Sequence, residues 1–342
     1  MPPEEQVVAQ TPKWHSRLFL LIFAVALTLR IAYLVDASSS PYFNHPILDS
    51  YWYESRAREV LAGDSLVSQG GFRVPLYVYF LAGCKSLFAS GYMATLVVQA
   101  ILGSLACGLV FLIGLRLFGI TAGIVAGLGL ALYRIAIFSD GELLPTTLFI
   151  LLILAGVYFL IEDLRQHRAY LSLIGGLFVG LAFLTRPDVL PFVVATVAVL
   201  CIILGVRRGL MRSIIFVIPL IAMMLLLGYR NKITSGDFYV LSPQGAVNLY
   251  AGNSLASDGK TPQAPATRTP YQITADPSDD AMLVASRLAA REEVGRELSD
   301  RDLGRYYIDR TLREIGADPL RWIRLVLRKV YYFFNSYEHS DI

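Results

Sequence analysis

Seven long apolar runs occupy the first two thirds of the chain, and they constrain its fold more than any other feature. Each is close to the roughly 20 residues that a helix needs to cross about 30 Å of hydrocarbon. Because lipid offers no hydrogen bonds, a spanning backbone must satisfy its own, which favours helices. We therefore predict an all-α polytopic membrane protein with a transmembrane bundle over residues 18–228. The runs cover residues 18–35, 92–115, 120–138, 143–161, 169–185, 189–206 and 213–228.

Composition agrees with a membrane protein. Of the 342 residues, 55% are hydrophobic and only 17% are charged, whereas soluble domains carry about a quarter charged residues. The first run is as long as a full span and carries Arg30 near its far end, so we do not interpret it as a cleaved signal peptide. The net charge of +3 is explained by basic loops at the membrane, and no patch for binding nucleic acid is visible.

The distribution of Lys and Arg in the short loops predicts the topology, since cytoplasmic loops retain these residues. The short loops of the opposite side hold only Arg134 and Arg186. Residues 1–17 are therefore expected in the cytoplasm, and residues 36–91 form an outer loop. Within it, the short apolar stretch 75–90 is predicted to be an interfacial or re-entrant helix, because a span there would reverse every later loop. The basic residues assigned to the cytoplasmic side are Lys13, Arg17, Arg116, Arg165, Arg168, Arg207, Arg208 and Arg212.

Residues 229–342 are predicted to form an extracytoplasmic insert. Residues 230–280 are rich in Gly, Pro, Ser, Thr and Asp, and we expect them to be loop-rich. Helical periodicity follows over 281–296, then helices starting near Ser299 and at Asp318-Pro319. The last helix interleaves basic and aromatic residues, which favours a position at the membrane surface over a soluble helix packed on its neighbours.

The centre of the outer loop holds the first candidate for chemistry, Asp49. Apolar residues at helical spacing predict an amphipathic helix over residues 51–62, ended by Gly63. Asp49 stands just before it. The carboxylate is either an N-cap of this helix or a general base at the membrane surface.

Other charged residues fall on the same predicted side. Asp140 and Glu142 lie in a short turn between two apolar runs, and Arg186 lies in another. Charges at the edge of hydrocarbon are costly unless they are hydrated or paired, and they are therefore candidates for function. Arg30, deep in the first run, needs a partner or a route to the surface. A divalent metal held by Asp140 and Glu142 is one further possibility.

These residues and their order resemble the C superfamily of membrane glycosyltransferases (GT-C), and family 39 in particular, which includes protein O-mannosyltransferases and the aminoarabinose transferase of lipid A. The late stretches 248–253 (NLYAGN) and Arg328-Lys329 through Tyr337-Glu338 resemble a bacterial branch of family 39 that often carries tetratricopeptide repeats after its membrane domain. The earlier matching residues are Arg30, Tyr33, Asp49-Ser50-Tyr51, Tyr53, Ala57, Leu61-Ala62-Gly63-Asp64, Pro75-Leu76-Tyr77, Glu142 and Thr185-Arg186-Pro187.

The resemblance implies a GT-C-like fold and a transfer reaction. The donor would be a polyprenyl-phosphate-linked sugar, the acceptor a hydroxyl of a protein, a lipid or a glycan, and the site would face outward from a bacterial inner or plasma membrane. Asp49 would be the base of an inverting attack, with substrate- or phosphate-binding roles for Arg30, Tyr53, Arg186 and Asn253. Relatives continue with further spans, so C-terminal spans are expected to be missing here.

Two other classes of protein remain open from the sequence. A secondary transporter also carries charges within its spans and Gly-rich helices, although no inverted internal repeat is visible. A non-catalytic membrane scaffold is the other alternative.

The predicted topology has a direct test. Asp49, Glu142, Arg186 and Asn253 should share the extracytoplasmic side, because only that arrangement keeps the Arg-rich loops in the cytoplasm. Introduced cysteines can be labelled with a membrane-impermeant reagent added from outside. Labelling at position 253 together with position 207 would contradict this topology.

Overall fold

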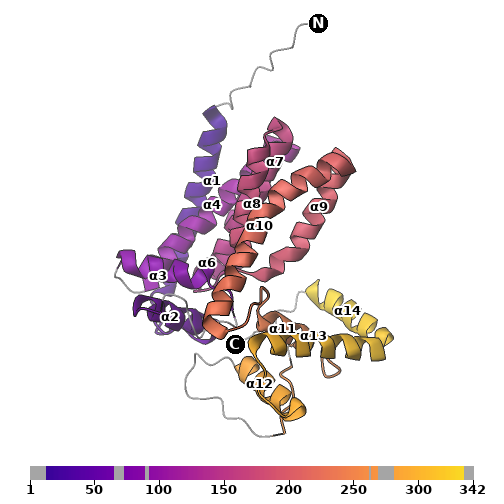
Figure 1. The fold of residues 1–342 in the computed structure, drawn as a ribbon. Helices are drawn as coiled ribbons and strands as arrows, with labels where there is room; N and C mark the ends of the chain where they lie inside the picture. The colour runs from indigo at the N-terminus through magenta and orange to yellow at the C-terminus, as the bar shows by residue number, and fades with distance from the viewer. Residues whose placement is uncertain (1–12, 65–72, 89–91, 262, 269–280, 335–342) are drawn as a thin grey trace. The chain divides into compact units, whose positions relative to one another are not determined.

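The computed structural model describes residues 13–64, 73–88, 92–261, 263–268 and 281–334, and within these ranges the regular structure is helical with no strand (Figure 1). This confirms the predicted all-α class. Tyr337 and Glu338, the N-terminal residues 1–12 and parts of the outer loop at 65–72 and 89–91 lie outside the described residues. The chain divides into two compact units. The first unit comprises Met1–Pro46 and Phe80–Ile221, and the second comprises Ile47–Tyr79 and Ala222–Ile342.

The first unit contains the apolar helices. Among the residues that the structure describes, five helices are long and apolar enough to cross a membrane. A sixth span results if α5 and α6, which meet at a bend of 57°, count as one. The helices of this unit are α1 (Lys13–Ala37), the part of α3 (Leu76–Phe88) from Phe80 onward, α4 (Tyr92–Phe118), α5 (Ile120–Leu132), α6 (Arg134–Asp140), α7 (Thr146–Gln166), α8 (Ala169–Phe183), the 3₁₀ turn η2 (Pro187–Val189), α9 (Leu190–Leu204) and the first half of α10 (Val206–Ser235).

The structure supports fewer spans than the seven predicted from the sequence. Helix α8 has 15 residues, which at 1.5 Å per residue gives about 22 Å, shorter than the hydrocarbon layer. The apolar run 169–185 predicted a longer helix because hydropathy does not register where the helix ends. Here α8 ends at Phe183, and Leu184 to Arg186 lead into the turn at Pro187.

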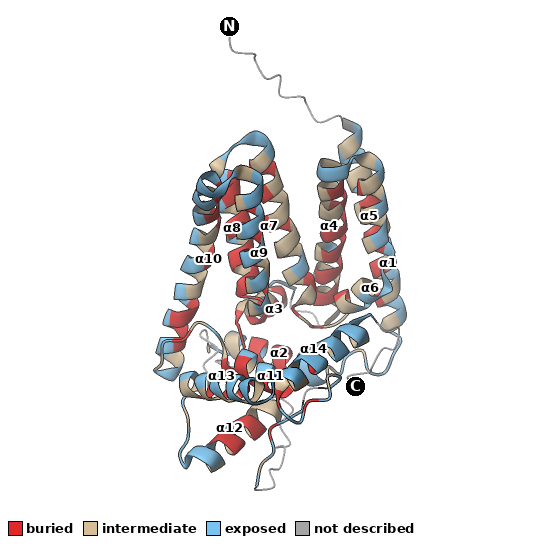
Figure 2. Ribbon diagram, turned by 90° about the vertical axis from the view of Figure 1, so that its right-hand side faces the viewer, coloured by how far each residue is buried: buried red, intermediate tan, exposed pale blue. Residues whose placement is uncertain are grey.

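Close helix pairs within the first unit rely on glycine. A Cβ added to Gly123 of α5 would lie 2.7 Å from the carbonyl oxygen of Phe111 and 2.9 Å from the amide nitrogen of Leu115, both on α4. One added to Gly175 of α8 would lie 2.9 Å from the carbonyl oxygen of Gly156 on α7. Small residues let backbones approach in membranes, where packing rather than hydrophobic burial joins helices. The inward face of α4 is the buried stripe in Figure 2.

The second unit contains shorter helices around its own core. That core brings together Ala246, Val247 and Tyr250 with Ala290, Leu303 and Tyr307. The helices are α2 (Leu48–Leu61), the first turn of α3 (Leu76–Phe88), the second half of α10, α11 (Pro243–Asn253), α12 (Ala281–Val294), α13 (Asp300–Ala317) and α14 (Pro319–Phe333).

Helix starts in the second unit follow the capping pattern in the sequence. The hydroxyl of Ser299 accepts from the amide of Asp302 at 3.3 Å, and the carboxylate of Asp318 accepts from the amide of Arg321 at 3.0 Å. The helices predicted over 281–296, from Ser299 and from Asp318 are therefore confirmed.

The loop-rich interpretation of residues 230–280 was wrong in part. Helix α10 continues to Ser235, and α11 occupies residues 243–253. Its start follows the usual rules, because the hydroxyl of Ser242 accepts from the amide of Gln244 at 3.1 Å and Pro243 takes the first helical position.

Gly123→Ala should destabilise the first unit by about 1–3 kcal/mol, because the added methyl meets backbone atoms of α4 that cannot move aside alone. Gly129→Ala on the same helix is the matched control, since nothing lies within 4 Å of its added Cβ. Thermal unfolding of the detergent-purified chain measures both. Equal melting temperatures for the two variants would contradict the close contact.

Candidate functional site

Asp49 lies inside the first turn of α2 and does not precede the helix. Helix α2 begins at Leu48, three residues earlier than predicted, and its N-cap is Ile47, whose side chain makes no capping hydrogen bond. The interpretation of Asp49 as the N-cap was therefore wrong. The side chain of Asp49 is 58% exposed, and its Oδ1 accepts a hydrogen bond from Nη2 of Arg73 at 2.8 Å.

Arg73 is held by aromatic rings of α2. Its guanidinium lies 4.8 Å from the ring centroid of Trp52 and 5.5 Å from that of Tyr53, and only 8% of its side chain is exposed. Tyr53 in turn meets Tyr77 edge to face, with centroids 5.0 Å apart. Cation–π contacts of a largely desolvated guanidinium are favourable. Tyr53 is itself buried, so its ring supports Arg73, which in turn fixes Asp49.

A second ion pair lies among the helices of the first unit. Nε of Arg30 on α1 donates to Oδ2 of Asp140, the last residue of α6, at 2.5 Å, and both side chains are buried. The hydroxyl of Thr147 on α7 donates to Oδ1 of the same carboxylate at 2.5 Å. The amide of Gln99 on α4 donates to the carbonyl oxygens of Asp140 at 3.0 Å and of Glu142 at 2.7 Å. Side chains of α1 and α7 thus bind the carboxylate of Asp140, and a side chain of α4 binds its backbone carbonyl oxygen.

This arrangement leaves Asp140 no role as a metal ligand. Both of its oxygens are taken by hydrogen-bond donors. A Cβ added to Gly103 would lie 2.1 Å from Oδ2 of Asp140, so little space surrounds the pair. Among the described residues, no group of three or more His, Cys, Asp or Glu side chains is placed to hold a metal ion. A buried carboxylate beside a guanidinium fits a structural ion pair.

Arg186 and Asn253 have different surroundings. Arg186 follows α8, donates to Oδ2 of Asp188 from Nε at 3.1 Å and from Nη2 at 2.8 Å, and keeps 44% of its side chain exposed. Asn253 ends α11, and its Oδ1 accepts from the indole of Trp322 and the ammonium of Lys329, each at 3.2 Å. Partial burial lowers the pKa of Lys329.

The predicted site residues thus form separate groups within the two units. Arg30 is joined to Asp140 in the first unit, and Asp49 is joined through Arg73 to Tyr53 in the second. The sequence reasoning missed Arg73, Gln99 and Thr147. The need of Arg30 for a buried acidic partner was a usable signal for Asp140, whereas no spacing rule connects Arg73 to a residue 24 positions away.

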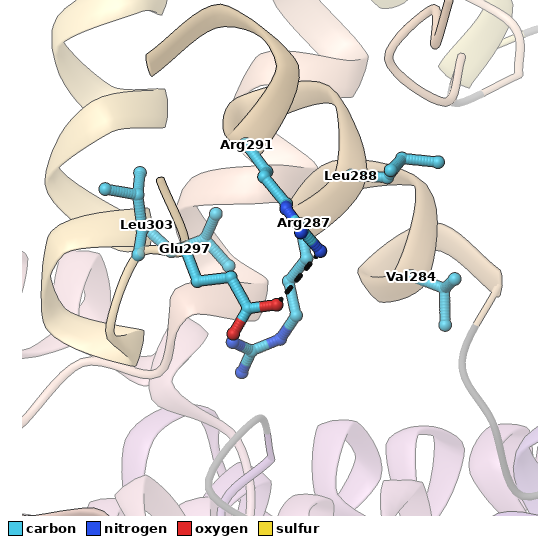
Figure 3. Close-up of a pocket in the computed structure, with 7 residues that line it drawn as sticks. Val284, Arg287, Leu288, Arg291, Glu297 and Leu303 are labelled. Atoms are coloured by element: carbon cyan, nitrogen blue, oxygen red, sulfur yellow. Dashed lines mark hydrogen bonds and ion pairs between the residues drawn. The ribbon is translucent and has the colours of Figure 1, made fainter. Parts of the chain in front are cut away.

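A surface pocket in the second unit contains none of the predicted site residues. Both of its arginines are paired with carboxylates. Arg291 pairs with Glu297 at 3.2 Å (Figure 3), and Arg287 pairs with Asp300. Its charges are therefore neutralised within the chain. The lining residues are Val284, Arg287, Leu288, Arg291, Glu297, Leu298 and Leu303.

Fold and composition define an integral, multi-pass all-α membrane protein. Residues 73–229 match the model of the dolichyl-phosphate-mannose-protein mannosyltransferase family. The expected resemblance to mannosyltransferase-like membrane glycosyltransferases of the C-superfamily type is thereby confirmed over this region. It favours an enzyme over a transporter. No curated protein and no solved structure matches the chain.

Arg30→Met should destabilise the first unit by about 3–5 kcal/mol, because it leaves the buried carboxylate of Asp140 without its counter-charge. The double variant Arg30→Met/Asp140→Asn should recover most of that loss, since neither charge remains. Arg17→Met, at an exposed position on the same helix, is the control. Thermal unfolding in detergent compares the variants, and a double variant no more stable than Arg30→Met would contradict the pairing.

Proposed function

We propose that this protein transfers a sugar from a polyprenyl-phosphate donor to an acceptor hydroxyl on the extracytoplasmic side of the membrane, with Asp49 as the general base. The name of the matching family makes mannose the first sugar to test and a protein hydroxyl the first acceptor. A hydroxyl of a lipid or glycan is the second class of acceptor.

The observation that carries this proposal is the geometry of Asp49. A general base must reach the proton that it removes, and the carboxylate of Asp49 is more than half exposed. Oδ1 is held by Arg73, while Oδ2 has no hydrogen-bond partner within the described part of the chain. One oxygen fixed and one oxygen open is the arrangement that a positioned base requires.

The proposed step is a single displacement with inversion. The acceptor hydroxyl gives its proton to Oδ2 of Asp49 while its oxygen forms a bond to the anomeric carbon. The bond from that carbon to the phosphate oxygen breaks, and the polyprenyl phosphate leaves with the electron pair. A phosphate is a good leaving group, so one carboxylate suffices to activate the acceptor.

The departing phosphate needs a cation nearby. Of the two arginines considered from the sequence, Arg186 is the more accessible, because 44% of its side chain is exposed against 2% for Arg30. Both arginines lie in the first unit whereas Asp49 lies in the second, so neither is assigned to this step.

Asp49→Asn should lower the rate of sugar transfer by about a hundredfold or more, because the amide cannot accept a proton. Its folding should be nearly unchanged, since the amide oxygen still accepts the hydrogen bond from Arg73. The measurement follows radiolabel from polyprenyl-phosphate mannose into the protein and lipid fractions of membranes, with matched amounts of the variant chains.

Glu59→Gln is the matched control for this experiment. Glu59 lies on the same helix and pairs with Arg56 at 2.9 Å, so its substitution also removes one charge and weakens one ion pair. Its transfer rate should stay close to that of the parent. If Asp49→Asn transfers sugar as fast as Glu59→Gln does, Asp49 only anchors Arg73 and is not the base.

A further inference from the structure

Helix α14 contacts the rest of the second unit through its polar face. Nη2 of Arg321 donates to the carbonyl oxygens of Ser254 at 3.1 Å and Ser257 at 3.4 Å. Trp322 and Lys329 donate to Asn253. The one buried residue of the helix, Leu325, lies between them. At 100° per residue, Arg321, Trp322, Leu325 and Lys329 occupy one side of the helix.

The opposite side of α14 is apolar and has no partner in the described part of the chain. Its side chains recur at helical spacing, as on the buried face of an ordinary amphipathic helix. Here they point away from the protein, and Figure 2 shows the exposed residues along this helix. The exposed fractions are 67% for Leu320, 47% for Ile323, 63% for Leu327, 49% for Val330 and 67% for Tyr331.

The neighbouring helix α13 shows the usual arrangement. Its apolar residues Leu303 and Tyr307 are fully buried against α11. A soluble unit with this composition would turn the apolar side of α14 inward in the same way. The reversed orientation of α14 therefore indicates that a second apolar medium covers this face.

Charge identifies that medium. Arg324 and Arg328 border the apolar face, and neither forms an ion pair with a carboxylate among the described residues. The contact given for Arg328 is with the carbonyl oxygen of Asp258 at 3.3 Å. An apolar stripe edged by arginines that no described carboxylate neutralises complements a bilayer surface, with acyl chains beneath and phosphates at the level of the headgroups. The chain also enters this unit directly from α10, a helix long and apolar enough to span.

We propose that α14 binds the surface of the bilayer, with Leu320, Ile323 and Leu327 inserted at the acyl boundary and Arg324 and Arg328 bound to lipid phosphates. The polar side of the helix then holds the turn 253–258 at a fixed position relative to the lipid surface. This inference rests on the chain being a membrane protein and is independent of the transfer reaction.

The experiment places a nitroxide label at position 327 of the full-length chain, by Leu327→Cys in a background where Cys84, Cys107 and Cys201 are alanine. The protein is reconstituted in nanodiscs of phosphatidylcholine mixed equally with phosphatidylglycerol. Relaxation by oxygen, which concentrates in lipid, is compared with relaxation by a water-soluble nickel chelate. Arg313→Cys, at an exposed position of α13, is the matched control.

The label at position 327 should respond to oxygen and be shielded from nickel, whereas the label at position 313 should respond to nickel. Equal nickel accessibility at both positions would overturn the proposal. If the label is shielded from both reagents and its spectrum is broadened by a neighbouring label, a second copy of the chain covers this face. That result would also overturn the proposal.

One further measurement tests the role of the arginines, and a second avoids dependence on the cysteine variants. The double variant Arg324→Gln/Arg328→Gln should raise the nickel accessibility at position 327. An unchanged nickel accessibility would contradict binding of the two arginines to lipid phosphates. In the unsubstituted protein, a phospholipid with a photoreactive group near the headgroup should crosslink to residues 320–331. Crosslinks confined to the spanning helices would contradict lipid contact by α14.

Discussion

The hydrocarbon interior of the bilayer supplies neither hydrogen bonds nor counter-ions, and this constraint accounts for most of the first unit. It explains why its spanning segments are helical. It also explains why Arg30 and Asp140 lie in contact. A guanidinium buried to this degree needs a carboxylate, and that carboxylate needs further donors for its second oxygen, which Thr147 supplies. The pair joins α1, α6 and α7 at one point.

The same constraint changes how the helices pack. Since lipid tails are as apolar as Leu side chains, burying Leu between helices contributes little to helix association. Close packing of the helix backbones stabilises the association instead. Gly123 lies against α4, and Gly156 faces Gly175 between α7 and α8. The bend between α5 and α6 has a related consequence. It ends the apolar segment in a short helix whose last residue is Asp140, so the carboxylate is presented by a helix end.

The second unit carries charged side chains that are exposed. Arg73 lies against aromatic rings and holds one oxygen of Asp49, so an exposed carboxylate acquires a fixed direction without being buried. Helix α14 is oriented opposite to an ordinary amphipathic helix, because its polar side contacts the protein and its apolar side is exposed. Both features agree with the proposed contact of α14 with lipid and with the proposed transfer from a lipid-linked donor. The family match over residues 73–229 supports the same kind of chemistry.

The sequence alone determined the all-α membrane class, the positions of the apolar helices and the starts of α13 and α14, because hydropathy and capping are local properties. It placed a helix over residues 51–62 with Asp49 before it, whereas α2 begins at Leu48, which has a positive φ, and includes Asp49 in its first turn. It overestimated α8 and missed α11. Only the tertiary structure decided that Asp140 neutralises Arg30, 110 residues away, and that Arg73 holds Asp49. Such partners are chosen by three-dimensional proximity, which no periodicity along the chain encodes.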